Sequence, residues 1–490
     1  MRDKLTFGSV CSGIEASQLA FSPFGFDQVW SSEIAEFPSK VLSHHYSNIP
    51  NLGDMIELPE LILKGNVQAP DLFCGGTPCQ AFSLAGWKNG LSDKRGQLTI
   101  TFIEIANAID EVRQKEKKAQ SIILWENVEG VLNDKTNAFG NFIAGLAGFS
   151  DEIKVNKWTK SGYLEGPNRN VAWRVIDAKY FGLPQQRKRL YVLAGGKDFR
   201  PDQVLFEFDS QDIVKKTKAN KQESLNGDIF NLFSQKFSNT ELKDERIFYK
   251  GNIKYEMFRE YTDCLYAAYG TKWNGNAAAY NGSLYIAQND KIRRFTPLEC
   301  ERLMGFPDNY TLINGNSDTN RFQAIGNSWA VPVVKWIGKQ IDKFLNSENQ
   351  EVICWYKSTR KSPNNLNANL YLIDNILFVS PKLYLNSSTI TNTPIESTIE
   401  DIVQTEGVLE KFYLSPQACR GILRRKEERD LKMNKQLEEL MIIIGEEKTM
   451  KIPIEEKCHN ITQVLQNGGL STKLNIRTST TTKNLKPLCL

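Results

Sequence analysis

The stretch "PDLFCGGTPCQAFS", residues 70–83, decides the fold of the first half of the chain. Its apolar run "DLFC" is followed by two glycines and then by Pro78 and Cys79. Short apolar runs that end in glycine and proline are typical of buried strands. Reacting groups in open α/β sheets lie at the carboxyl ends of strands, and Cys79 comes directly after such an end. The stretch therefore predicts a strand that carries a cysteine nucleophile, although a free cysteine taken alone is as often a buried core residue.

Strand-like and helix-like runs alternate on both sides of this stretch. Such alternation is typical of a parallel sheet that is covered by helices on both faces, and it places the chain in the α/β class. We expect strands within residues 4–13, 27–34, 69–76, 121–130 and 189–196, and helices within 14–24, 35–46 and 97–114.

The alternation stops near residue 200, and the remainder of the chain divides by composition. The next ninety or so residues lack a clean period, which predicts a small, irregular domain. A helical pattern resumes with Thr296 as N-cap and Pro297 behind it. The last part is rich in Asn, Ser, Thr and Lys and predicts a weak core. The predicted divisions are a first domain (1–199), the irregular domain (200–290), a return segment that completes the first domain (291–347), and a partly disordered C-terminal extension (348–490) with one helix near 415–444.

Composition restricts the class of protein. The chain has 490 residues, of which 41% are hydrophobic and 24% charged, as in an ordinary globular protein of several domains. No run of about eighteen apolar residues occurs, and the N-terminus enters a strand-like run directly. We therefore expect no membrane span, no signal peptide and a cytoplasmic location. The net charge of +4 permits a polyanionic partner without demanding one.

Histidine and cysteine usage argues against a metal centre. The chain has three histidines, and its nine cysteines include no C-x-x-C pair. Zinc sites need closely spaced ligands of these types, so we expect no metal, and we expect the cysteines to be reduced thiols.

Three further patterns contain side chains that could take part in binding or catalysis. Glu126 follows the apolar run "SIIL", so its carboxyl group falls at a strand end, where it can hydrogen-bond to or protonate a ring nitrogen. Arg187 and Arg189 alternate on one face and suit an anion or a base. Gly13 follows a strand, and Glu33 lies 20 residues beyond it, where a carboxylate can bind ribose hydroxyls. Strand-end carboxylates, solvated basic patches and glycine turns are also common without any function.

Five motifs together resemble those of the DNA cytosine-5 methyltransferase family of bacteria and phages. In chain order they are "GGTPCQAFS" (75–83), "ENVEG" (126–130), "QQRKRLYVL" (185–193), "RRFTPLECERLMGFPD" (293–308) and "IGNSWAVPV" (325–333). The resemblance implies a Rossmann-like, S-adenosylmethionine-dependent methyltransferase domain, with residues 200–290 as the target-recognition domain. The sequence departs from the family in "CSGIEA", where Cys11 replaces an aromatic residue and Glu15 and Ala16 replace glycines.

The resemblance also implies two sets of site residues. Cys79 would attack carbon 6 of a flipped cytosine, and Pro78 would stiffen the turn that aims it. Glu126 would hold and protonate ring nitrogen 3, and Arg189, with Arg187 nearby, would bind the carbonyl oxygen at carbon 2. The implied cofactor site consists of Cys11, Ser12, Gly13, Ile14, Glu33, Asp54, Leu98, Asn327 and Ser328. Residues 81–97 would close over the flipped base.

The implied partner is double-stranded DNA. We expect a monomer, with a restriction endonuclease encoded separately as its counterpart. Three alternatives stay open: a tRNA cytosine methyltransferase, a catalytically inactive DNA-binding protein, and a Rossmann oxidoreductase. The long irregular domain favours DNA, because a duplex sequence has to be read by an additional element. Every motif ends by about residue 335, so the sequence predicts that the C-terminal extension is dispensable for catalysis.

Overall fold

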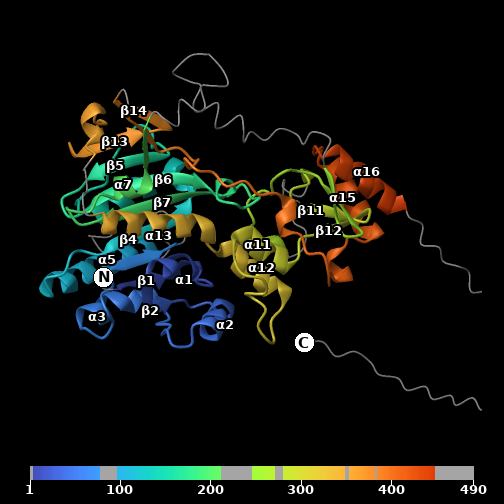
Figure 1. The fold of residues 1–490 in the computed structure, drawn as a ribbon, viewed down its shortest axis with the longest axis horizontal. Helices are drawn as coiled ribbons and strands as arrows, with labels where there is room; N and C mark the ends of the chain where they lie inside the picture. The colour runs from blue at the N-terminus through green and yellow to red at the C-terminus, as the bar shows by residue number, and fades with distance from the viewer. Residues whose placement is uncertain are drawn as a thin grey trace, which may run out of the picture.

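A computed structural model describes residues 4–77, 97–210, 246–270, 280–347, 353–380 and 383–446. The chain forms two lobes, which lie side by side in Figure 1. The first lobe is built on an eight-stranded sheet and the second on a four-stranded sheet. Helices α11 (Pro297–Met304) and α12 (Asp318–Asn327) lie between the two sheets in this view. Within the described ranges, no helix combines the length and the apolar composition that a membrane span requires.

The large sheet has the strand order β13-β5-β6-β7-β4-β3-β1-β2. Its strands are β1 (Leu5–Val10), β2 (Phe26–Ser32), β3 (Leu72–Gly75), β4 (Ile122–Val128), β5 (Ser161–Glu165), β6 (Asn170–Asp177), β7 (Lys188–Gly195) and β13 (Asn369–Ile373). Strands β2, β1, β3 and β4 are parallel, whereas β7, β6, β5 and β13 each run antiparallel to their neighbours. The predicted α/β class is confirmed, but the prediction of a parallel sheet is wrong for this second half. For the pair β5 and β6 the cause is local: four residues join them, and a connection that short can join only antiparallel strands.

Side chains alternate along the strands and build one apolar cluster on each face of the large sheet. On β3, Phe73 faces one cluster, and Leu72 and Cys74 face the other. The face of Phe73 is covered by α3 (Leu58–Leu63), α5 (Gln97–Lys115) and α6 (Ala138–Ala147). The opposite face is covered by α1 (Ala16–Phe21), α7 (Pro201–Leu205) and α13 (Val331–Asn346).

The second lobe holds an antiparallel sheet in the order β12-β11-β10-β9. Its strands are β9 (Ile247–Lys250), β10 (Ile253–Met257), β11 (Tyr285–Gln288) and β12 (Lys291–Arg294). The predicted N-cap at Thr296 is confirmed: its hydroxyl accepts from the backbone N–H of Glu299, whose carboxylate accepts in turn from the Thr296 N–H. Helix α2 (Glu36–His45) of the first lobe contacts α12, which brings the lobes together near the ends of β1 and β2.

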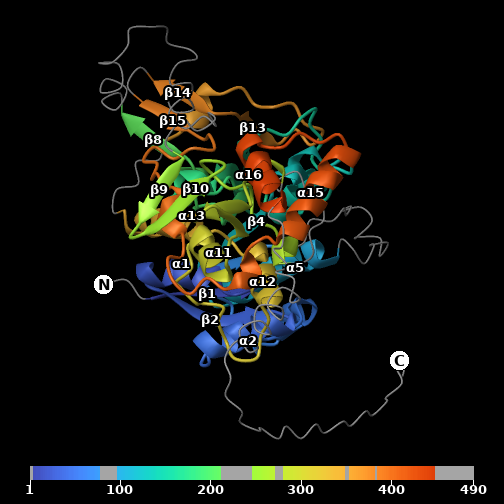
Figure 2. The ribbon, with the colours of Figure 1, turned by 90° about the vertical axis from the view of Figure 1, so that its right-hand side faces the viewer.

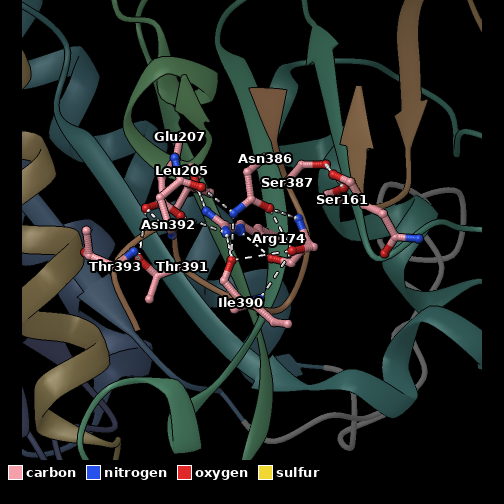
Figure 3. A network of polar contacts seen from close by, with 12 residues as sticks. Ser161, Arg174, Leu205, Glu207, Asn386, Ser387, Ile390, Thr391, Asn392 and Thr393 are labelled. Atoms are coloured by element: carbon pink, nitrogen blue, oxygen red, sulfur yellow. Dashed lines mark hydrogen bonds and ion pairs between the residues drawn. The ribbon is translucent and has the colours of Figure 1, made fainter. Parts of the chain in front are cut away.

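The C-terminal extension is part of both lobes. Strand β13 extends the large sheet, and β14 (Ile376–Ser380) and β15 (Leu383–Asn386) form a small sheet with β8 (Glu207–Ser210). Figure 3 shows how Arg174 of β6, 1% exposed, fixes the next segment: it donates to the carbonyl oxygens of Ser388 (2.7 Å) and Ile390 (2.8 Å) and pairs with Glu207 (3.0 Å). The extension then runs to the second lobe, where α14 (Ile399–Ile402), α15 (Pro416–Glu428) and α16 (Lys435–Glu446) pack.

Two predictions for the extension are wrong. The single helix near 415–444 is two helices, which lie side by side in Figure 2. The chain reverses because Asp430 takes a left-handed φ of 47° and the N–H of Leu431 closes on the carbonyl of Lys426. The weak core was predicted for the extension outside that helix, and there the core is not weak either. Its buried apolar residues include Trp355, Leu370, Ile399, Ile402 and Phe412.

Candidate active site

A cavity of about 770 Å³ opens at the carboxyl ends of the four parallel strands, between the first lobe and α12. Strand β7 begins at the same edge because it runs antiparallel to β4. The walls include Cys11, Gly13, Glu33, Asp54, Gly76, Thr77, Leu98, Glu126, Asn127, Arg187, Arg189, Gln323 and Asn327. The fold therefore brings most of the predicted cofactor and base residues into one space.

The loop after β1 forms one wall of this cavity and is tied to the end of β2. The backbone N–H of Gly13 donates to Glu33 Oε2 at 2.8 Å, and the N–H of Ala35 donates to Glu33 Oε1 at 2.7 Å. Gly13 has a left-handed φ of 56°, and no atom lies within 4 Å of the position that a Cβ would take. The glycine is needed for its backbone conformation, and it leaves an open cradle beside the Glu33 carboxylate.

Cys11 lies where the family pattern has an aromatic side chain. Its Sγ is 3.8 Å from Met55 Sδ, so two sulfur atoms line this part of the cavity. Burial, together with the negative charges of Glu33 and Asp54, raises the pKa of Cys11 to about 12. The thiol is therefore neutral at physiological pH and serves as an apolar wall. Asp54 also caps a 3₁₀ turn by accepting from the N–H of Ile56 at 3.1 Å.

Glu126 and Arg189 form a buried pair on the opposite wall. Arg189 Nε lies 3.1 Å from Glu126 Oε1, and Glu126 is 8% exposed. This contact is an ion pair, and within the described part of the chain no further donor reaches Oε1. Burial raises the pKa of Glu126, while the charges of Arg189 and Arg187 and a hydrogen bond from Trp329 lower it in part. Because burial favours the protonated form, this carboxyl group is a candidate proton donor.

Arg187 lines the cavity and also holds the surrounding backbone. Its guanidinium donates to the carbonyl oxygens of Leu265 (3.0 Å), Gly326 (3.3 Å) and Ser328 (2.7 Å), and it is 3% exposed. Cys264 Sγ lies 3.3 Å from Arg187 Nη1 and 3.3 Å from Arg189 Nη2. The second lobe thus contacts both arginines.

The turn that leads to Cys79 is anchored from β4. Trp125 Nε1 donates to Thr77 Oγ1 at 2.9 Å, and Asn127 Nδ2 donates to the Thr77 carbonyl at 3.0 Å. Pro78, Cys79 and all but the last residue of the expected closing segment 81–97 lie outside the described residues. The chain therefore enters this segment from the edge of the cavity that Glu126 lines.

Not every predicted cofactor residue lines the large cavity. Ser12 and Ser328 line a smaller adjoining cavity of about 50 Å³, which also reaches Gly13, Glu126 and Asn327. Ile14 is 0% exposed and packs into the apolar cluster of the second lobe. Its carbonyl oxygen accepts from the Tyr310 hydroxyl at 2.8 Å, so Ile14 supports the loop from behind.

Comparison with known proteins agrees with this geometry. Residues 5–343 match the family described as C-5 cytosine-specific DNA methylase. The chain belongs to this family. The match ends before the first strand of the C-terminal extension, β13.

Relatives of the C-5 cytosine-specific DNA methylase family differ in their names. The chain is 34% identical to the "DNA N-6-adenine-methyltransferase" of Escherichia phage P1, over 69% of this chain and 61% of that protein. It is 31% identical to "Type II methyltransferase M.SsoII" of Shigella sonnei, over 69% of this chain and 79% of the relative. Among solved structures, the Entamoeba histolytica methyltransferase EhMeth is 14% identical, with a TM-score of 0.41 over 71% of this chain and 100% of its own. The chain therefore spans less than two thirds of the phage P1 protein.

Three side chains at this cavity were not singled out from the sequence. Asn127 and Trp329 stand inside the quoted motifs "ENVEG" and "IGNSWAVPV", so position alone could have flagged them. Cys264 stands in a stretch without any periodic signal, and only the tertiary fold brings it to the two arginines.

Proposed function

We propose that this protein transfers a methyl group from S-adenosylmethionine to carbon 5 of cytosine in DNA. The observation that carries the proposal is that one cavity holds both the Gly13–Glu33 cradle and the buried Glu126 carboxyl group, which is ion-paired with Arg189. A buried carboxyl group whose pKa is perturbed by burial and by a neighbouring charge, in a cavity, is a candidate for proton transfer to a ligand. DNA as the substrate class is implied by the family.

The residues of the cavity fit the cofactor. The open position beside Gly13, the carboxylates of Glu33 and Asp54, and the apolar side chain of Leu98 suit a nucleoside with an amino-acid tail. Asn327 would close the site from α12. S-adenosylmethionine supplies the methyl group that carbon 5 takes up.

The chain's own residues would prepare the cytosine. The Cys79 thiolate adds to carbon 6, which breaks the aromatic system and places an electron pair at carbon 5. Glu126 protonates ring nitrogen 3, so that the ring does not carry the negative charge, and Arg189 donates to the oxygen at carbon 2. After methylation a base removes the proton from carbon 5, and the Cys79 sulfur leaves with its electron pair.

Nucleoside analysis tests the activity. Plasmid DNA incubated with the protein and S-adenosylmethionine should yield 5-methyldeoxycytidine, and the Cys79→Ser variant should yield none while still binding the cofactor. The wild type should also form a denaturation-resistant adduct with DNA that carries 5-fluorocytosine. N6-methyldeoxyadenosine as the product, as the name of the phage P1 relative would suggest, or methylation of tRNA alone, would contradict the proposal.

We further propose that residues 200–290 read the DNA sequence. In the described part of this region, β9 carries exposed apolar side chains, Ile247 at 47% and Tyr249 at 65%. Exchange of the region with that of a relative should move the methylated site, which bisulfite sequencing of plasmid DNA would report.

Three finer proposals follow from the family. The protein acts as a monomer, in the cytoplasm of a bacterium or a phage-infected host, and a separately encoded endonuclease is its counterpart, as the type II names of relatives suggest for those relatives. Sedimentation velocity tests the first proposal, and cell fractionation the second. Cleavage of unmethylated DNA by extracts of the source cells tests the third.

A further inference from the structure

Tyr310 lies in the segment between α11 and α12, where its side chain meets the loop of residues 11–15 that follows β1. We propose that Tyr310 is a positioning residue for the cofactor: its hydroxyl holds the backbone of Ile14 and thereby the shape of the Gly13–Glu33 cradle. This inference rests on the proposed function, because it concerns the cofactor that the cradle would bind.

The backbone of this loop needs support from its surroundings. Cys11, Gly13 and Glu15 have left-handed φ angles of 48°, 56° and 61°. This conformation suits the glycine but is unfavourable for the two residues that carry a Cβ, so contacts around the loop have to stabilise it. One such contact is the hydrogen bond of 2.8 Å from the Gly13 N–H to the Glu33 carboxylate.

A second contact is the buried hydrogen bond between Tyr310 and Ile14. The Tyr310 hydroxyl donates to the Ile14 carbonyl oxygen at 2.8 Å, and the two residues are 4% and 0% exposed. A buried carbonyl that loses its donor is costly, so the loop would shift to pair this group elsewhere. Because Gly13 is the adjacent residue, such a shift would change the cradle.

The proton of the Tyr310 hydroxyl is committed to Ile14. The hydroxyl of Tyr46 lies 3.0 Å from that of Tyr310. A carbonyl oxygen can only accept and a hydroxyl carries one proton, so Tyr46 donates to Tyr310 and Tyr310 donates to Ile14. Burial raises the pKa of Tyr310 well above its usual value, so the hydroxyl remains a donor at every pH used for an assay.

The ring of Tyr310 is fixed by the end of α2. His45 stacks on it, with ring centroids 4.1 Å apart and an interplanar angle of 4°. His45 Nε2 also lies 2.7 Å from the Tyr310 carbonyl oxygen, to which it donates. Phe306 packs against the same ring, at a centroid distance of 4.9 Å. The hydroxyl is therefore aimed at the loop before any cofactor binds.

The test is direct binding of S-adenosylhomocysteine, the demethylated cofactor, to the full chain by isothermal titration calorimetry. Tyr310→Phe keeps the ring and removes the hydroxyl, so we expect the Kd to rise about tenfold. In steady-state methylation the KM for S-adenosylmethionine should rise by a similar factor, whereas the turnover number at saturating cofactor should change by less than about twofold. A merely structural hydroxyl would lower the Tm without moving either constant.

Tyr255→Phe is the matched control. The Tyr255 side chain is also buried, and its hydroxyl donates to the carbonyl oxygen of Gln404 at 3.1 Å. This variant loses the same type of bond at β10 rather than at the cofactor loop, so its Kd should stay within about twofold of wild type. Tyr46→Phe leaves the bond between Tyr310 and Ile14 in place, and we expect its Kd to rise by less than about threefold.

Wild-type affinity in a folded Tyr310→Phe variant would overturn the inference, and so would an equal loss of affinity in Tyr255→Phe. Should Tyr310→Phe fail to fold, His45→Ala is the second test. His45 is exposed, and its removal frees the ring of Tyr310, so the Kd should rise about threefold or more, and an unchanged Kd overturns the inference. A wild type that binds S-adenosylhomocysteine but forms no 5-methylcytosine would instead refute the proposed function.

Discussion

At the scale of single residues, Glu15 is a departure from the family motif with a clear physical consequence. The side chain is 0% exposed and accepts hydrogen bonds from the hydroxyls of Ser9 (3.0 Å) and Ser17. Burial raises its pKa to about 7, although these hydroxyls and Gln28 lower it in part. Glu15 also has a left-handed φ of 61°, which suits the glycine that the family has here.

A pH-dependent stability follows from this carboxyl group. Its pKa rises on folding from 4.5 to about 7. The stability associated with it is therefore complete below about pH 4.5 and is lost as pH rises through about 7, by roughly 3 kcal/mol. Glu15→Gln cannot ionise, so we expect its Tm to exceed that of wild type at pH 8 and to match it at pH 4.

Thermal melts at the two pH values measure the effect. Glu36→Gln is the control, because the Glu36 side chain is 83% exposed. An equal change of Tm at pH 4 and pH 8 for Glu15→Gln would mean that backbone strain or packing, rather than ionisation, governs this position.

From the sequence, residues of the candidate site could be predicted only where they belong to a recognisable motif. Glu126, Arg189, Gly13 and Glu33 were predicted from strand ends and glycine turns, and the fold brings all four to one cavity. Their individual roles remain predictions. The contacts of Cys264 depend on a loop of the second lobe reaching β7, and no local pattern encodes such an approach.

At the scale of elements, local patterns located the strands but could not give their directions. β4 and β7 were both expected as strands of a parallel sheet, but β7 runs antiparallel to β4. β5 and β6 were not predicted. β6 is buried along its whole length, so it lacks the alternation that marks a strand with one exposed face.

The side chain of Gln185, just before β7, contacts both the loop that holds Leu265 and helix α11. A substitution of Gln185 therefore tests how the second lobe is attached to the first. Gln185 Oε1 accepts from the N–H of Leu265 at 2.7 Å, and its Nε2 donates to the carbonyl of Leu303 at 2.9 Å. The side chain is 0% exposed. Gln185→Ala leaves two buried backbone groups without partners, so we expect a loss of about 2–4 kcal/mol and faster hydrogen exchange across residues 261–270.

Gln186→Ala is the control for this prediction, since the Gln186 side chain is partly exposed. Hydrogen exchange followed by mass spectrometry measures both variants. If residues 261–270 stay as protected in Gln185→Ala as in wild type, the attachment depends on the backbone pairing of Gln185 with Thr262 rather than on the side chain.

At the scale of the whole molecule, the C-terminal extension connects the two lobes. In the first lobe it supplies β13 and the segment that Arg174 holds. In the second lobe, the N–H of Gln404 donates to Glu299 Oε1 at 2.8 Å, and Asn434 donates to the carbonyl oxygens of Tyr280 (2.9 Å) and Phe258 (3.1 Å). An element that contacts both lobes fixes their relative position, and the cavity of the candidate site lies between them.

The structure therefore indicates that the C-terminal extension is needed for catalysis, whereas the sequence predicts that it is dispensable. A chain that ends at residue 347 would expose the edge of β5 and remove the apolar residues that α14, α15 and α16 bury in the second lobe. We expect this chain to lose its cooperative melting and most of its methylation, because an exposed strand edge and uncovered apolar surface favour aggregation.

Two longer chains separate the causes of such a loss. A chain that ends at residue 446 keeps every described element and is the reference for the two shorter chains. A chain that ends at residue 394 keeps β13 to β15 but lacks the segment that packs on the second lobe. We expect this chain to bind cofactor and to methylate at least tenfold more slowly. The reason is that Arg187, in the proposed base site, is held by Cys264 and Leu265 of the second lobe. Steady-state methylation and cofactor titration measure all three chains. Full turnover by the chain that ends at residue 347 would show that the catalytic cavity forms without the extension, as the motifs alone had predicted.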